Sequence, residues 1–310
     1  MTVRHSHIAA KCIAVGIFLL AGALQAADGP RSKRTDIRVD SNLVLVPVSV
    51  TDPKNHPVVG IDASQFRIFE GKTEQQVVNV STEDTPVSVG IVFDGSASMA
   101  GKLTKAREAV VEFLKSANPE DEFFLVNFAS TAQLAVPFTD SPGEIQTRLM
   151  YATTKGKTAL LDAVYLALST MRQARNPRKA LLIISDGGDN DSRYTEMEIR
   201  KTVRETEVSI YAIGIYAGGS VVLPEEERGG PKLLSNLADE TGGRHIAIEN
   251  VRDLPAAAAK IAMELRNQYL VGYRPSSVAL DGKFHKVQVK LVDAGGLQLS
   301  WRAGYYAPVP

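Results

Sequence analysis

The 310-residue chain is 44% hydrophobic and 23% charged, and its 35 basic residues balance its 35 acidic residues. These values are typical of a globular protein that is neither disordered nor embedded in a membrane. A net charge of zero argues against a nucleic-acid-binding protein, which normally carries a basic surface. The length allows one large domain with a smaller one, or two ordinary domains.

Residues 1–26 have the pattern of a secretory signal peptide. The basic residues Arg4 and Lys11 precede an apolar stretch, residues 12–24, that is too short to span a bilayer stably. An uncleaved anchor is the alternative. The only cysteine, Cys12, lies in this segment, so the mature chain would contain no disulfide. We therefore expect an exported protein, periplasmic or extracellular, whose mature chain has no membrane span.

A polar lead-in over residues 27–40 is followed by a segment of closely spaced strands, residues 41–85. Alternating and β-branched apolar runs predict three strands, over residues 42–51, 65–69 and 76–80. Strands that follow one another without helices indicate a small β unit, distinct from the region that follows.

From residue 86 to residue 250, predicted strands alternate with predicted helices. Strands are expected over 87–93, 122–129, 179–185, 208–216 and 244–248, with an edge strand over 133–138. Helices are expected over 103–117, 142–151, 159–171, 196–206 and 232–240. This alternation predicts an α/β fold with a doubly wound, Rossmann-like and mostly parallel sheet.

The C-terminal part of the chain returns to strands. An alanine-rich helix within residues 251–268 is expected to close the α/β domain, and three strands follow, over 269–273, 285–292 and 298–305. Ala294-Gly295-Gly296 predicts a hairpin between the last two strands. We expect residues 269–310 to pack with residues 41–85, so that one small β domain is built from both ends of the chain.

Side chains with oxygen atoms follow two of the predicted strands of the α/β region and precede one of its predicted helices. Asp94, Ser96 and Ser98 follow the strand over 87–93, Asp186 follows the strand over 179–185, and Thr158 precedes an apolar helix. The carboxyl ends of parallel strands share one edge, where ligands bind in open α/β sheets. Hydroxyls with few carboxylates suit Mg²⁺, which keeps several waters. The pattern predicts a metal site made of Asp94, Ser96, Ser98, Thr158 and Asp186.

Residues 86–250 resemble a von Willebrand factor type A (VWA) domain with a metal-ion-dependent adhesion site. The DGSAS sequence matches the D-x-S-x-S motif of that family, and Thr158 and Asp186 match its threonine and its second aspartate. Ala97 stands where many members have glycine, which removes no ligand. The flanking sequences, such as QFRIFEGKTEQQV and NQYLVGYRPS, are similar to VWFA-related proteins that are abundant in acidobacteria.

The resemblance implies that three hydroxyls contact the metal and that two carboxylates act largely through water. The hydroxyls are those of Ser96, Ser98 and Thr158, and the carboxylates are those of Asp94 and Asp186. The metal would be Mg²⁺, with Mn²⁺ possible. Because neutral hydroxyls quench the charge of the ion only in part, the ion would stay attractive to an Asp or Glu carboxylate of a protein partner.

Two other interpretations of the same region are not supported by the residues. Lys155 to Thr158 resembles the end of a phosphate-binding loop, but Tyr151 stands where that motif needs a glycine. A serine nucleophile would need a histidine base, and both His245 and His285 fall in predicted strands away from the serines. Asp189 and Asp191, close after Asp186, could support the metal site or form a second cation site, but we expect them to lie in a solvated loop.

The predicted function is a metal-dependent, adhesion-type protein-binding module and not an enzyme. The alternative is a structural or assembly factor of the cell envelope, in which the metal mainly stabilises the fold. A metal-assisted hydrolase is the weaker alternative, because no general base is evident near the predicted site.

Overall fold

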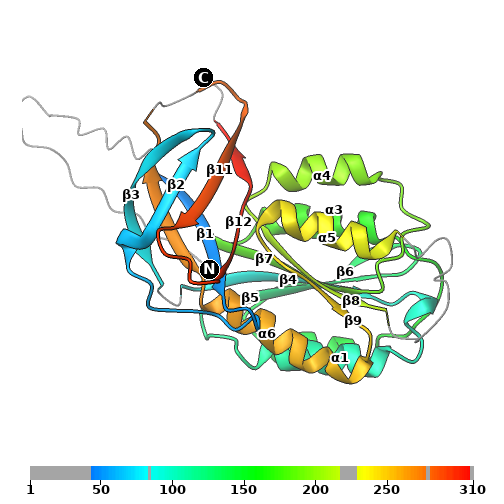
Figure 1. Cartoon of the computed structure of the whole chain (residues 1–310). Helices are drawn as coiled ribbons and strands as arrows, with labels where there is room; N and C mark the ends of the chain where they lie inside the picture. Colours follow the sequence, from blue (N-terminus) through cyan, green and yellow to red (C-terminus); the bar gives the residue numbers. More distant parts are fainter. Residues whose placement is uncertain (1–42, 83–84, 217–228, 277–279, 308–310) are drawn as a thin grey trace, which may run out of the picture. The chain divides into compact units, whose positions relative to one another are not determined.

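The computed structural model describes residues 43–82, 85–216, 229–276 and 280–307. The predicted signal peptide and lead-in lie outside these residues. Two sheets organise the described chain, one of six strands and one of seven (Figure 1). In the ranges just given, no helix has both the length and the apolar character needed to cross a membrane.

The six-stranded sheet has the strand order β6-β5-β4-β7-β8-β9. Its strands are β4 (Val87–Asp94), β5 (Glu122–Phe128), β6 (Ala132–Thr139), β7 (Arg178–Ser185), β8 (Ser209–Ile215) and β9 (His245–Ile248). Neighbouring strands pair in parallel, except that β6 pairs antiparallel with β5 at the edge. The order runs outward from β4 in both directions, which confirms the predicted doubly wound fold class.

Helices cover both faces of this sheet (Figure 1). They are α1 (Leu103–Leu114), α2 (Pro142–Met150), α3 (Leu160–Met171), α4 (Glu196–Arg204), α5 (Gly230–Thr241) and α6 (Leu254–Arg266). Apolar side chains of α1, α2 and α6 share a core on one face, and those of α3, α4 and α5 share a core on the other. Because both faces are covered, all eight residues of β4 are buried, which explains its nearly continuous apolar sequence.

The seven-stranded sheet is antiparallel throughout, with the order β12-β1-β10-β3-β2-β11-β13. Its strands are β1 (Val44–Thr51), β2 (Phe66–Glu70), β3 (Thr73–Ser81), β10 (Tyr269–Arg274), β11 (Phe284–Leu291), β12 (Gln298–Trp301) and β13 (Gly304–Tyr306). Strands from the two ends of the chain are interleaved in this order and share one apolar core. The small β domain is therefore assembled from both flanks, as predicted. Three short 3₁₀ turns complete the elements: η1 (Ala63–Gln65), η2 (Ala97–Met99) and η3 (Val251–Asp253).

The C-terminal ribbon differs from the predicted one. The expected strand over 298–305 is two strands, with a break at residues 302–303. β12 pairs with β1, whereas β13 pairs with β11, so no hairpin joins two continuous strands around residues 294–296. Near the break, the Trp301 indole donates a hydrogen bond to the Val287 carbonyl (3.0 Å). A strand has the same alternation of side chains whether it pairs with β1 or with β11. The sequence pattern therefore did not reveal that β12 and β13 pair with different strands.

His285, expected to be structural, lies in a polar cluster of the β domain. Its Nδ1 atom is 2.5 Å from Glu70 Oε1, and its Nε2 atom is 3.2 Å from Asp281 Oδ1. Glu70 also accepts a hydrogen bond from the Tyr273 hydroxyl (3.0 Å). The hydrogen bond that His285 donates to Glu70 raises the pKa of His285. The cluster links β2, β10 and β11 and lies outside the VWA-like region.

Candidate metal centre

The loop after β4 brings Asp94, Ser96 and Ser98 together. Asp94 and Ser96 are buried, and Ser98 is partly buried. The backbone N–H of Ser96 donates to Asp94 Oδ1 (2.8 Å), and the Ser96 and Ser98 hydroxyl oxygens are 2.9 Å apart. The backbone N–H of Gly95 donates to the Phe128 carbonyl at the end of β5 (2.7 Å). This loop is therefore held against the neighbouring strand, with its hydroxyls side by side.

Asp186 follows β7, which is the other neighbour of β4 in the sheet. Ser185, just before it, donates from Oγ to Asp94 Oδ2 (2.5 Å) and accepts from the N–H of Gly187 (2.9 Å). The Asp186 side chain is buried. Its Oδ2 atom accepts a hydrogen bond from the Lys102 ammonium (3.1 Å), whereas its buried Oδ1 atom has no hydrogen-bond partner among the residues that the structure describes. The two carboxylates are thus placed at the same edge of the sheet.

The loop that carries Thr158 is tied to both of these segments through the backbone. The N–H of Ala97 donates to the Gly156 carbonyl (3.0 Å), which joins it to the loop after β4. The N–H of Thr158 donates to Asn190 Oδ1 (2.9 Å), and its carbonyl accepts from the N–H of Asn190 (2.9 Å). The Thr158 side chain is buried. The structure therefore gathers the three loops that carry the predicted ligands.

The electrostatics of the site are unfavourable for two ionised carboxylates. Burial, and then the charge of Asp186, raise the pKa of Asp94 from 3.8 to about 6, although Ser185 and Ser96 donate hydrogen bonds that lower it. Lys102, which is largely buried at the start of α1, is the cation that pairs with Asp186. A further cation beside these carboxylates would relieve their repulsion.

The residues present fit a hard divalent ion. The unpartnered Oδ1 atom of Asp186 is a buried oxygen that needs a donor or a cation. The other predicted ligands are also oxygens, which Mg²⁺ and Mn²⁺ prefer. Among the residues that the structure describes, no three His, Cys, Asp or Glu side chains form a metal-binding group. The hydroxyls would therefore have to supply much of the coordination.

Sequence reasoning missed two polar side chains around the site. Lys102 carried no signal beyond its place four residues after Ser98. Asp189, expected in a solvated loop, is half-buried and accepts from the Leu161 N–H (3.2 Å) and the Ser192 hydroxyl (2.5 Å). Its carboxylate therefore satisfies a donor in the first turn of α3. Asp191 pairs with Lys157 (3.2 Å).

The family model of the von Willebrand factor type A domain matches residues 89–188 of this chain. The chain contains a VWA domain. The matched residues include the loop after β4, Thr158 and Asp186, so the candidate metal centre lies wholly within the VWA match.

Relatives and a solved structure share this region. Inter-alpha-trypsin inhibitor heavy chain H4 of Bos taurus is 27% identical over 150 residues, which are 43% of this chain and 16% of that protein. An uncharacterized protein of Borreliella burgdorferi is 23% identical over 182 residues, 52% of this chain and 53% of that protein. The chain thus spans about half or less of these relatives. The structure of a von Willebrand factor type A protein from Catenulispora acidiphila superposes with a TM-score of 0.51 at 14% identity, covering 86% of this chain and 74% of that one, and shows the fold.

Proposed function

We propose that this protein is a cation-dependent protein-binding module, in which a divalent ion in the VWA domain attracts a carboxylate of a partner. The observation that carries the proposal is the buried, unpartnered Oδ1 atom of Asp186, close enough to Asp94 to raise the pKa of that carboxyl. The VWA domain by itself supports a protein-interaction role.

The predicted ligands divide into two groups with different roles in this proposal. The Ser96, Ser98 and Thr158 hydroxyls would hold Mg²⁺ or Mn²⁺, and Asp94 and Asp186 would balance its charge. The bound ion supplies an electrophilic position for an Asp or Glu side chain of the partner. Ser185 and the backbone N–H of Ser96 keep both oxygens of Asp94 oriented by hydrogen bonds.

We infer a binding role and not a catalytic one from the placement of the histidines. His245 lies in β9, with its Nε2 atom 3.1 Å from the Tyr216 hydroxyl, and His285 lies in the β domain beside Glu70. Neither histidine contacts Ser96 or Ser98 in these hydrogen bonds. Residues 1–26 have the pattern of a signal peptide. We therefore propose that this binding protein is exported to the periplasm or the cell exterior.

A calorimetric titration with Mg²⁺ and with Mn²⁺ tests the proposal on the mature wild-type chain. One saturable site is expected, and the melting temperature should rise with ion concentration because the ion binds only the folded state. Pull-downs from an envelope extract, with Mg²⁺ or with EDTA, then ask whether partner binding needs the ion. Absence of ion binding would refute the proposal. Lower melting temperature in EDTA with unchanged partners would favour the structural role instead.

Lys102→Met is expected to raise the affinity for Mg²⁺ about tenfold, equivalent to about 1.4 kcal/mol. The reason is that the Lys102 ammonium competes with the ion for Asp186, and methionine keeps the side-chain length without the charge. Calorimetry measures the change. Lys105→Met is the control, because Lys105 is exposed and pairs with Glu108 on the helix surface. Equal or weaker binding by Lys102→Met contradicts the expectation.

A further inference from the structure

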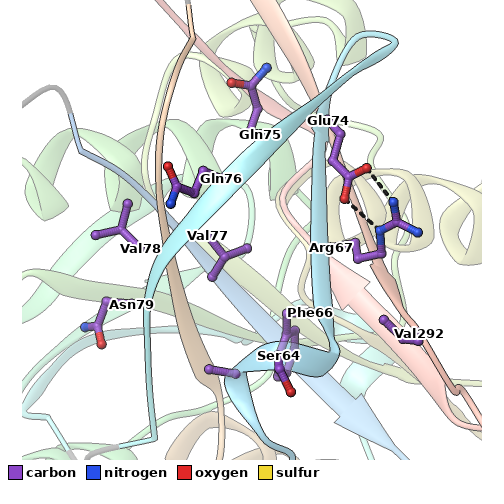
Figure 2. Close-up of a pocket in the computed structure, with 11 residues that line it drawn as sticks. Ser64, Phe66, Arg67, Glu74, Gln75, Gln76, Val77, Val78, Asn79 and Val292 are labelled. Carbon is purple, nitrogen blue, oxygen red and sulfur yellow. Dashed lines mark hydrogen bonds and ion pairs between the residues drawn. The ribbon is translucent and has the colours of Figure 1, made fainter.

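The β2–β3 hairpin opens away from its turn. Near the turn the strands pair over three positions, from Glu70 with Thr73 to Ile68 with Gln75. Farther from the turn, β3 pairs only with β10, over residues 76–81, whereas β2 pairs with β11 along its whole length on its other edge. Figure 2 shows the two strands diverging. Within the described part of the chain, no strand pairing joins residues 66–67 to residues 76–81.

A β-bulge in β3 accompanies this divergence. Val77 pairs with Tyr273 and Asn79 pairs with Gly272, so Val78 is an extra residue without an opposite partner in β10. A bulge increases the local twist of its strand and re-aims the side chains beside it. Val78 is 49% exposed although it is apolar. The bulge therefore turns β3 away from β2 and leaves a valine at the opening.

The diverging strands border a cleft of about 480 Å³ (Figure 2). Val78 and Val292 are the large apolar residues of its lining that are exposed, and Val292 is 65% exposed. Phe66, a residue of the β-domain core, also lines the cleft. Gln76 and Asn79 contribute polar but uncharged groups from β3. The cleft thus combines apolar contacts with neutral hydrogen-bonding groups.

The charged residues of the lining neutralise each other. Arg67 donates from Nε to Glu74 Oε1 (2.7 Å) and from Nη2 to Glu74 Oε2 (2.5 Å), as the dashed lines in Figure 2 mark. In this bidentate ion pair each charged side chain already has its opposite charge, so neither needs a ligand to neutralise it. A charged ligand would gain no opposite charge here without breaking the pair. The lining is complementary to an uncharged ligand.

The free edge of β3 specifies the conformation of that ligand. In an antiparallel strand, the N–H and C=O groups of alternate residues point to opposite sides, so about half of residues 76–81 direct theirs away from β10 and toward the opening. An unpaired strand edge is a template for an extended chain. We propose that an extended, uncharged segment of a partner protein adds along β3 as a strand, with apolar side chains against Val78 and Val292. This surface is independent of the metal centre.

A capped, fluorescent heptapeptide, Thr-Val-Thr-Val-Thr-Val-Thr, is the probe for this surface. Saturable binding by fluorescence anisotropy is expected, together with at least tenfold slower hydrogen exchange, when the peptide is saturating, at those amides of residues 76–81 that face the opening and not β10. The same peptide with alternate residues N-methylated should bind at least tenfold more weakly, because it lacks half of its backbone donors. Both measurements use the mature chain in EDTA, so that the metal centre plays no part.

Matched variants locate the binding. Val78→Glu is expected to weaken peptide binding at least tenfold, because it places a charge against the apolar side chains of the added strand. Val59→Glu, at a valine that is 56% exposed outside the cleft lining, should bind the peptide as the wild type does. The proposal is overturned if the peptide does not bind, if the N-methylated peptide or Val78→Glu binds equally well, or if the amides of residues 76–81 that face the opening already exchange slowly without peptide.

Discussion

Asp94→Asn is expected to abolish Mg²⁺ binding and, in EDTA, to raise the melting temperature of the protein. The carboxylate is buried beside Asp186, and its pKa is raised from 3.8 to about 6. Ionised Asp94 therefore costs the metal-free fold about 2–4 kcal/mol above pH 6. Asparagine is nearly isosteric and removes this charge repulsion, but it also removes the charge that would hold the ion. The two effects have opposite signs, so a simple loss of folding cannot imitate them.

The pH dependence of this variant separates the charge from other effects. Because the pKa of Asp94 is higher in the folded state, the folded protein binds the extra proton between about pH 4 and pH 6, and the contribution of Asp94 to wild-type stability falls as the pH rises through that window. In EDTA, the difference in unfolding free energy between Asp94→Asn and wild type should therefore grow from pH 4 to pH 6 and then level off. Thermal or urea unfolding across this range measures it.

Asp189→Asn is the matched control for the same experiment. Burial also raises the pKa of Asp189, but this carboxylate accepts from the Leu161 N–H and from Ser192, outside the proposed ligand set. The control should keep Mg²⁺ binding. Retained Mg²⁺ affinity in Asp94→Asn, or a lower melting temperature of that variant in EDTA, would contradict the assignment of Asp94.

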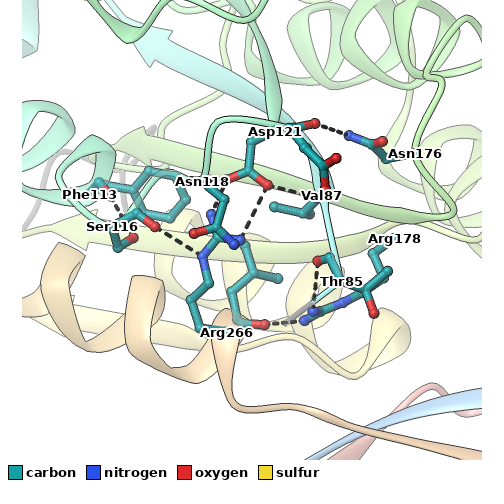
Figure 3. A network of polar contacts seen from close by, with 11 residues as sticks. Thr85, Val87, Phe113, Ser116, Asn118, Asp121, Asn176, Arg178 and Arg266 are labelled. Atoms are coloured by element: carbon teal, nitrogen blue, oxygen red, sulfur yellow. Dashed lines mark hydrogen bonds and ion pairs between the residues drawn. The ribbon is translucent and has the colours of Figure 1, made fainter. Parts of the chain in front are cut away.

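Arg266→Met is expected to destabilise the fold by about 3–5 kcal/mol, because it leaves a buried carboxylate without its ion pair. Asp121 is fully buried and accepts hydrogen bonds from Arg266 and from the backbone N–H groups of Val87 (2.9 Å) and Asn118 (2.8 Å) (Figure 3). Arg266 also donates to the Ser116 carbonyl (3.1 Å). This network joins the end of α6 to the start of β4, the strand that leads into the candidate metal centre.

Urea unfolding of Arg266→Met measures the loss of unfolding free energy. The melting temperature should also fall, by about 10 °C. Arg200→Met is the control, because its ion pair with Glu240 is only partly buried, with the Arg200 side chain 35% exposed, so it should contribute less than the pair of the fully buried Asp121. The double variant Asp121→Asn/Arg266→Met should lose less stability than the sum of the single variants. A loss in Arg266→Met no larger than that in Arg200→Met would show that the buried pair is not needed.

The α/β fold could be predicted because its physical signals are local. A strand buried on both faces requires a continuous apolar run, as in β4, and helices over the sheet require an apolar stripe, as in α1. The alternation of such segments allows few topologies. The C-terminal β strands carried no such constraint, since β12 and β13 have the same alternation whichever strand they join. Their division between β1 and β11 therefore required the tertiary structure.

The sequence by itself determined where the candidate ligands stand along the chain, because Asp94, Ser96 and Asp186 follow strands that end at one edge of a sheet. It could not determine their electrostatic surroundings. Lys102 meets Asp186 across 84 positions of sequence, and Ser185 meets Asp94 across 91. Such contacts depend on side-chain packing between separate elements and leave no periodic signal. The splayed edge of β3 depends on tertiary structure for the same reason, since its bulge exists only relative to β10.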